Sequence, residues 1–253
     1  MRFEEYRSRF PVSRVDAEEF LGARYQDLRQ LGSMRNQQIK PVDPRYGGIC
    51  MVTADPESAA EHIAAFYDFL AETRLVDHIE SQFDPWVPDT VSKLIVGERV
   101  VDVGCCDGRY TVYYALNHPT KQFVGIDLSE KSVILATERA RKHGVKNVTW
   151  LPGNIRYVQF PETDTFVLNN VMHELYGASS VAPHLSAVDD FGEFVNPGGR
   201  IIVSQELCIP GQVAVDIIES TADDIQNGFR LHKVEFKEQG GSGVYVAAFE
   251  KVR

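Results

Sequence analysis

The chain has 253 residues, 43% of them hydrophobic, and a formal net charge of −10 at pH 7. This size predicts one large globular domain, or one domain with an appendage, and the acidic charge argues against a nucleic-acid partner because phosphate binding requires a basic surface. No window approaches 18 uninterrupted apolar residues and no polybasic run is present, so we expect no membrane partner and a cytoplasmic location. The four cysteines include no C-x-x-C pair, which favours reduced thiols and no bound metal.

The first third of the chain reads as helical. Residues 16–31 have apolar positions at helical spacing, and the turn-rich residues 40–48 end that pattern. Asp55-Pro56-Glu57 supplies an N-cap, an N1 proline and an acidic first turn for a helix to about residue 70. Asp89 is expected to start another helix, to about residue 95. We therefore predict that residues 1–96 form a helical extension that packs on the remaining domain and covers a binding-site mouth.

From residue 97 onward, strands and helices alternate. This order predicts an α/β fold, with a doubly wound, mostly parallel seven-stranded sheet that ends in a C-terminal antiparallel hairpin. The expected strands are residues 100–103, 122–126, 148–151, 165–168, 200–204, 229–238 and 244–252. The expected helices cover residues 109–117, the segment after Ser129, the segment from about residue 181, and residues 211–227. The turn before strand five is Asn196-Pro-Gly-Gly199.

A glycine-containing loop follows the first of these strands, at the start of a helix. It reads Asp102-Val-Gly104-Cys-Cys-Asp-Gly108, and backbone N–H groups at a helix N-terminus are suited to a polar ligand. The loop lacks the G-x-G-x-x-G spacing of a dinucleotide fingerprint, which argues against nicotinamide or flavin binding. A tight turn without a ligand remains an alternative when this loop is considered alone.

The next two strands also end in polar residues. Asp127 follows the second strand, roughly 20 residues beyond the loop, where a nucleoside-binding βαβ unit places its ribose-binding acid. The alternative role for Asp127 is a helix N-cap, for which Ser129 is better suited. Gly153 and Asn154 follow the third strand, and the amide oxygen of Asn154 can accept a hydrogen bond from an adenine amino group.

These residues resemble motif I and the following strand ends of the class I S-adenosylmethionine-dependent methyltransferases. Asp102, Gly104 and Gly108 match the acidic-x-Gly-x-Gly-x-Gly pattern, and Cys106 replaces the middle glycine. The resemblance covers about residues 97–253 and implies a Rossmann-like domain with S-adenosylmethionine as cofactor. The cofactor-binding residues that it implies are Asp102, Gly104, Cys105, Cys106, Gly108, Asp127, Leu128, Asn154, Ile155 and Asn170.

Ligands of such sheets bind beyond the carboxyl ends of the strands, so the segment after strand four should form the reactive edge. Residues 169–176 read NNVMHELY, which is similar to the V-L-H-D/E segment of many small-molecule methyltransferases. His173 is a candidate general base or a structural histidine behind the cofactor. Tyr176 either faces the sulfonium as a site wall or packs in the core. The uncharged Asn169 and Asn170 make magnesium binding improbable.

Three functions follow from this reading. The first is a methyltransferase that acts on a small molecule, in secondary metabolism for example. The second keeps the fold but uses S-adenosylmethionine itself as substrate, as in cyclisation to azetidine-2-carboxylate with release of methylthioadenosine. The third is a non-catalytic S-adenosylmethionine-binding scaffold. The sequence indicates neither the acceptor nor the oligomeric state.

Overall fold

The computed structural model describes residues 1–2, 5, 38–41, 49–52, 56–72, 85–172, 175, 183–207, 211–222, 225, 228–239 and 242–252. Within these ranges, no helix is both long enough and apolar enough to span a membrane.

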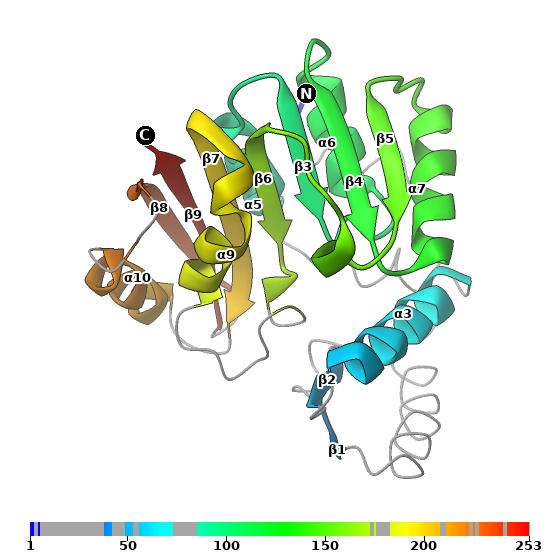
Figure 1. Cartoon of the computed structure of the whole chain (residues 1–253), viewed down its shortest axis with the longest axis horizontal. Helices are drawn as coiled ribbons and strands as arrows, with labels where there is room; N and C mark the ends of the chain where they lie inside the picture. The colour runs from blue at the N-terminus through cyan, green and yellow to red at the C-terminus, as the bar shows by residue number, and fades with distance from the viewer. Residues whose placement is uncertain are drawn as a thin grey trace.

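A seven-stranded sheet forms the centre of the molecule (Figure 1). Its strand order is β5-β4-β3-β6-β7-β9-β8; neighbours from β5 to β7 are parallel, and β9 is antiparallel to both β7 and β8. This arrangement confirms the predicted α/β fold with its C-terminal antiparallel hairpin. The strands are β3 (Arg99–Val103), β4 (Gln122–Asp127), β5 (Val148–Pro152), β6 (Thr163–Asn169), β7 (Val195–Leu207), β8 (Phe229–Gln239) and β9 (Ser242–Lys251).

Helices cover both faces of this sheet. On one face lie α5 (Trp86–Leu94), α6 (Arg109–Asn117) and α7 (Glu130–Lys142). On the other lie α9 (Pro183–Phe191) and α10 (Gly211–Ser220). Two short 3₁₀ turns, η2 (Ile155–Tyr157) and η3 (Gly192–Phe194), lie on the same face as α9 and α10.

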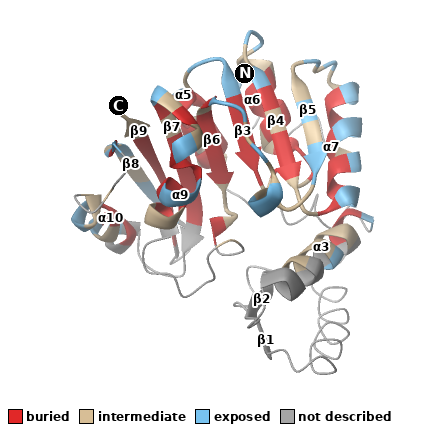
Figure 2. Cartoon of the chain, in the orientation of Figure 1, coloured by how far each residue is buried: buried red, intermediate tan, exposed pale blue. Residues whose placement is uncertain are grey.

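The core lies in two layers, one on each side of the central strands. On β3, Val100 belongs to the cluster that contains Val112 and Tyr114 of α6, and Val101 to the cluster that contains Val188 of α9. Figure 2 shows the buried residues concentrated in these central strands. Burial on both faces explains why the strands read as continuous β-branched runs instead of alternating apolar and polar residues.

The described part of the N-terminal third contains strands as well as helix. Strands β1 (Gln38–Pro41) and β2 (Ile49–Val52) pair antiparallel, and α3 (Pro56–Glu72) follows them. The predicted helix to about residue 70 is therefore confirmed as α3. The described residues of the predicted helical extension thus include one strand pair that the sequence did not indicate, and the extension as a unit stays a prediction. The helix predicted over residues 16–31 lies outside the described residues.

Helix α5 starts earlier than predicted. It begins at Trp86, and Asp89 lies in its first turn, where its carboxylate accepts a 2.5 Å hydrogen bond from the Tyr113 hydroxyl. Asp89, which the sequence indicated as the start of this helix, thus binds a side chain of α6. Val91 and Leu94 of α5 are buried in the same cluster as α6, so this helix belongs to the core of the sheet. A domain boundary at residues 96 and 97 stays a prediction.

Two other element ends differ from the sequence prediction. The turn expected at residues 196–199 lies within β7, where pairing moves from Thr163 with Val195 to Thr165 with Arg200 and the intervening residues form a bulge. Helix α10 ends at Ser220 and not near residue 227. The hydroxyl of Thr221 donates to the main-chain oxygen of Ile217 at 2.8 Å, and such side-chain bonds compete with helix continuation.

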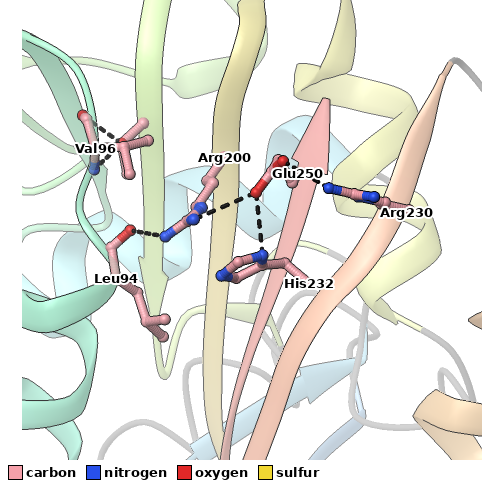
Figure 3. A network of polar contacts seen from close by, with 7 residues as sticks. Leu94, Val96, Arg200, Arg230, His232 and Glu250 are labelled. Atoms are coloured by element: carbon pink, nitrogen blue, oxygen red, sulfur yellow. Dashed lines mark hydrogen bonds and ion pairs between the residues drawn. The ribbon is translucent and has the colours of Figure 1, made fainter. Parts of the chain in front are cut away.

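A polar network joins α5 to the C-terminal hairpin at the amino end of β7 (Figure 3). Arg200 donates to the main-chain oxygen of Leu94 (3.1 Å) and to Glu250 (3.2 Å). Arg230 donates to the other carboxylate oxygen of Glu250 at 3.1 Å, and Nδ1 of His232 lies 3.0 Å from the first. One carboxylate on β9 therefore binds side chains from β7 and β8 together.

Candidate functional site

The three predicted strand ends meet at Asp127. Oδ2 of Asp127 accepts a 2.8 Å hydrogen bond from the backbone N–H of Cys106, in the loop after β3. The main-chain oxygen of Asp127 accepts one from the N–H of Gly153, after β5, also at 2.8 Å. The loops after β3, β4 and β5 are thus bonded to one residue. The structure brings together the parts from which the sequence predicted a nucleoside site.

The carboxylate of Asp127 is not the cap of α7. Its Oδ1 accepts from the backbone N–H of Ser129 at 2.8 Å, and the Ser129 side chain itself caps the helix by accepting from Ser132 N–H at 2.9 Å. This confirms Ser129 as the N-cap. Asp127 is half-buried at the edge of the sheet. Each of its two carboxylate oxygens accepts a hydrogen bond from a backbone N–H group.

The loop between β3 and α6 requires glycine at its two matching positions. Gly104 has φ +68° and Gly108 has φ +71°, in the left-handed region. A Cβ on Gly104 would lie 2.5 Å from the side chain of Val171, and one on Gly108 would lie 2.5 Å from Trp150. Packing behind the loop is therefore enough to explain both glycines. Beside Asn154, a Cβ built on Gly153 would meet no atom within 4 Å, so packing does not explain the glycine at this position.

The two cysteines of the loop have different environments. Cys105 is buried, and burial raises the pKa of its thiol well above the usual value. Its side chain therefore packs in the interior, and only its backbone is placed to approach a ligand. Cys106 is half-buried at φ +48°, in the conformation that glycine adopts with least strain.

Asp102, the acidic residue of the motif, lies under the loop on the α6 side of β3. It is 2% exposed, and Oδ2 accepts a 2.6 Å hydrogen bond from the hydroxyl of Thr111. Burial, together with the nearby charge of Asp127, raises the pKa of Asp102 to about 7, against the lowering effect of the Thr111 bond. This carboxyl group thus changes its charge near neutral pH, at the base of the site.

A buried ion cluster that the sequence did not indicate lies on the other side of the loop. The carboxylate of Asp107 pairs with Arg139 of α7 and lies 3.4 Å from Arg109 of α6. Burial alone would raise the pKa of Asp107, but the two guanidinium groups outweigh it and hold the pKa below the usual value. The side chain of Arg139 also donates to the main-chain oxygen of Asp107 at 3.0 Å. This cluster holds the loop that connects β3 to α6 in place against α6 and α7.

The end of β6 contributes two asparagines with separate roles. Nδ2 of Asn169 donates to the hydroxyl of the buried Tyr114, and its Oδ1 accepts from the Ser204 hydroxyl, both at 2.8 Å. The side chain of Asn169 therefore joins the end of β6 to α6 and β7. Asn170 has φ +49°, and its Oδ1 accepts a 2.6 Å hydrogen bond from Gln205. Among the described residues, Cys106 and Asn170 are the non-glycine residues with positive φ, and both follow carboxyl ends of strands.

The residues after β5 line the neighbouring edge. Asn154 caps η2, since its side-chain oxygen accepts from the N–H of Arg156 at 3.0 Å. The side chain of Arg156 donates to the main-chain oxygen of Leu175 at 3.1 Å, which links η2 to the segment after β6. Ile155 packs partly buried against the second core cluster, and Leu128 is half-buried. Their contact with a cofactor, like that of Asn154, stays a prediction.

The two predicted catalytic side chains, His173 and Tyr176, lie outside the described residues, as does Glu174. Their roles stay predictions. Within the described ranges, no group of three or more histidine, cysteine or acidic side chains is arranged to bind a metal ion.

Comparison with known sequences gives a family. A family model described as a methyltransferase domain matches residues 95–236. A bifunctional glycosyltransferase/methyltransferase of Fusobacterium nucleatum is 30% identical over 30% of this chain, which corresponds to 11% of that protein. The ribosomal RNA small subunit methyltransferase G of Shewanella baltica is 25% identical over 64% of this chain and 76% of that protein. The chain therefore spans only a small part of the first of these relatives.

Solved structures share the fold. The [4+2]-cyclase SpnF matches with a TM-score of 0.58 at 16% identity, over 76% of this chain and 96% of that chain. A SAM-dependent methyltransferase from Geobacter sulfurreducens, solved with S-adenosyl-L-homocysteine, matches with a TM-score of 0.51 at 17% identity, over 67% of this chain and 92% of that chain. Since the family model covers more than half of the sequence and the sheet has the predicted architecture, the chain belongs to the methyltransferase domain family, within the class I S-adenosylmethionine-dependent methyltransferase superfamily that its glycine loop resembles.

Proposed function

We propose that this chain is an S-adenosylmethionine-dependent methyltransferase that acts on a small molecule. The observation that carries the proposal is the position of Asp127, whose carboxylate and main-chain oxygen bind the N–H groups of Cys106 and Gly153. The residues present fit the nucleoside part of this cofactor, because a half-buried carboxylate lies at the carboxyl end of β4, where a nucleoside-binding βαβ unit places its ribose-binding acid.

In this proposal, each strand end binds one part of the cofactor. When bound, S-adenosylmethionine supplies a methyl group on a positively charged sulfur. Asp127 accepts hydrogen bonds from the ribose hydroxyls, Asn154 accepts one from the adenine amino group, and the backbone of the loop from Gly104 to Gly108 approaches the amino-acid part. Leu128 and Ile155 supply apolar surface beside the adenine. Asp102, when ionised, favours the positive charges of the ligand.

Methyl transfer by direct displacement depends mainly on positioning and exclusion of water. In this proposal Asn170, which follows β6, is one of the residues that contact the cofactor. His173 would take the proton released by the acceptor, and the ring of Tyr176 would face the sulfonium, where an aromatic face contributes roughly 0.5 to 2 kcal/mol.

A small-molecule acceptor is favoured by the net charge of −10, since an RNA-binding surface should be basic. The Shewanella baltica relative is named as a ribosomal RNA methyltransferase, so RNA is the acceptor class to be tested against it. At 25% identity, that relative's name does not decide the substrate.

The second candidate function uses S-adenosylmethionine itself as substrate. It is favoured by α3, a helix that packs against α7 and binds Ser129, two residues from Asp127, because an N-terminal cover over the cofactor would suit a reaction that needs no acceptor. In that reaction the amino group displaces the sulfur within the same molecule. The products are azetidine-2-carboxylate and methylthioadenosine.

The test is chromatography with mass detection on the purified full chain and S-adenosylmethionine, with heat-inactivated protein as control. One set of reactions contains no acceptor, a second contains pooled small-molecule acceptors, and a third contains total RNA. The proposal predicts S-adenosylhomocysteine only in the second set. S-adenosylhomocysteine with RNA alone would contradict the small-molecule assignment, and methylthioadenosine without acceptor would favour the second candidate. Binding without turnover in any set would indicate a non-catalytic scaffold.

A further inference from the structure

Helix α3 supplies a carboxylate to the first turn of α7. Oδ1 of Asp68 accepts a 2.6 Å hydrogen bond from the hydroxyl of Ser129 and a 3.1 Å hydrogen bond from the backbone N–H of Lys131. Acidic side chains stabilise a helix N-terminus because its N–H groups lack partners within the helix. Here the acidic residue, Asp68, lies 61 residues before Ser129 in the chain.

Ser129 is bonded on both sides. Its backbone N–H donates to Oδ1 of Asp127, and its hydroxyl donates to Asp68 while accepting from the N–H of Ser132. Ser129 is 0% exposed, and its partners Asp68 and Asp127 are half-buried. One buried residue therefore connects α3 to the carboxylate that we assign to the ribose.

Apolar packing accompanies this contact. Leu70 and Ala71 of α3 are each 2% exposed, and Figure 1 shows α3 beyond the carboxyl end of β4, beside the first turn of α7. Glu72 forms an ion pair with α7, to Lys131 at 3.3 Å, but both of those side chains are about half exposed. Of these two polar contacts, the one made by Asp68 leads through the buried Ser129 toward Asp127.

We propose that Asp68 is a positioning residue that couples the docking of α3 to nucleoside binding at Asp127. This inference rests on the proposed function, because it takes Asp127 as the ribose acid. Ribose hydroxyls that donate to Asp127 hold this carboxylate in one position, which also holds the N–H and hydroxyl of Ser129 in the orientation that Asp68 requires. Docking of α3 then costs less conformational entropy, and by linkage α3 strengthens nucleoside binding to the same extent.

The first test is hydrogen exchange, detected by mass spectrometry, on the wild-type full chain with and without saturating S-adenosylmethionine. The proposal predicts slower exchange of the α3 amides (residues 56–72) in the presence of the ligand. Methylthioadenosine, which has the nucleoside but no amino-acid part, should give the same protection. Ligand binding that leaves α3 exchange unchanged overturns the proposal, and this result does not depend on any variant folding.

The second test is S-adenosylmethionine affinity by calorimetry in Asp68→Ala, Asp68→Asn and Glu72→Gln. Asp68→Ala should weaken binding about fivefold or more, in the range typical of coupled sites. Asp68→Asn keeps an acceptor oxygen and should lose less. Glu72→Gln removes the exposed pair of the same helix and is the matched control, with unchanged affinity.

A purely structural role for Asp68 gives a different pattern. In that case Asp68→Ala speeds exchange of α3 equally with and without ligand and leaves the affinity at the wild-type value, which overturns the coupling. If the wild type binds no S-adenosylmethionine, the proposed function fails and the coupling with it. If the wild type binds and only the α3 response is missing, the coupling alone fails.

Discussion

The backbone N–H of Cys106 donates a 2.8 Å hydrogen bond to Oδ2 of Asp127. Cys106 stands where the methyltransferase motif has a glycine, and its φ of +48° lies in the left-handed region that glycine adopts with least strain. The substituted position of the loop is therefore bonded directly to the predicted ribose acid. Changes at Cys106 should affect both the stability of the loop and the orientation of Asp127.

Cys106→Gly should leave stability within about 1 kcal/mol of the wild type, because relief of the left-handed strain is offset by the larger entropy that glycine loses on folding. S-adenosylmethionine affinity should be equal or higher. Cys106→Val should cost about 1 to 3 kcal/mol, since a β-branched residue fits this conformation poorly. Denaturant unfolding and calorimetry measure both effects. Cys106→Ala keeps the Cβ but not the thiol, so loss of affinity in both the Gly and Ala variants would show that the thiol itself is needed.

Asp102 should make the ligand-free protein less stable as pH rises from about 4 to about 7. Its pKa is about 7 in the folded protein and near 3.8 when unfolded, so the folded state binds the extra proton in this window and the unfolded state does not. Each unit of pKa difference is worth about 1.4 kcal/mol. Asp102→Asn cannot titrate and should remove this slope. Denaturant unfolding at several pH values measures it, and equal slopes in the two proteins would refute the assignment.

The same titration should affect ligand selectivity. S-adenosylmethionine carries a sulfonium charge that S-adenosylhomocysteine lacks, and an ionised Asp102 favours that charge. The ratio of the two affinities should therefore rise in favour of S-adenosylmethionine as pH increases through about 7 in the wild type. In Asp102→Asn, calorimetry should give a ratio that is constant with pH. A constant ratio in the wild type would place the charge of Asp102 out of reach of the ligand.

His184 of α9 should reduce stability in acid. It is 1% exposed, stacks on Phe249 with ring centroids 5.6 Å apart and lies 2.9 Å from the Thr221 hydroxyl. Burial lowers its pKa to about 4, so between pH 6.5 and 4 the unfolded chain binds a proton that the folded chain does not. The free energy of unfolding should fall by up to about 3 kcal/mol as pH falls through this window.

His184→Phe should flatten this acid dependence. Phenylalanine keeps the stacking, and Thr221 keeps its hydrogen bond to the main-chain oxygen of Ile217. Thermal unfolding from pH 7 to pH 4.5 compares the two proteins. If both lose stability in parallel, His184 is not the titrating group.

Glu250→Gln should destabilise the junction between α5 and the terminal hairpin by about 1 to 3 kcal/mol, because a hydrogen bond to a charged partner is lost at a half-buried site. The Arg230 bond, with a contribution from Arg200, holds the pKa of Glu250 below its usual value. Glu235→Gln is the control: it removes an ion pair to the half-exposed Lys233, and exposed pairs contribute about 0 to 1 kcal/mol. Equal unfolding midpoints for the two variants would contradict a structural role for the network.

The parallel core of the fold followed closely from the sequence, because strands buried on both faces appear as apolar runs between turns. The ends of α5, β7 and α10 did not. They depend on tertiary contacts, such as Asp89 with Tyr113 and the bulge that pairs Arg200 with Thr165, which have no local pattern. The pairing of β1 with β2 was missed because the sequence between them was read as the end of a helix.

The site shows the same division. The convergence at Asp127 was predictable because carboxyl ends of parallel strands lie at one edge of a sheet. The contacts that fix it were not, since Asp107 pairs with Arg139, 32 residues later, and Asp68 binds Ser129, 61 residues later. A single sequence gives no signal for such pairs. The acidic residue Asp102, two residues before the motif glycine Gly104, was visible in the sequence. Its raised pKa depends on burial, which only the fold reveals.

The most direct test of the account is calorimetric titration of S-adenosylmethionine into the wild type and Asp127→Ala, with thermal unfolding to verify that the variant is folded. The account predicts binding of one ligand per chain to the wild type, and an affinity at least about tenfold weaker in Asp127→Ala, because charge-assisted hydrogen bonds contribute about 1.5 to 3 kcal/mol each. Equal affinity in a folded Asp127→Ala variant would contradict the ribose assignment. No binding to the wild type would contradict the proposed function itself.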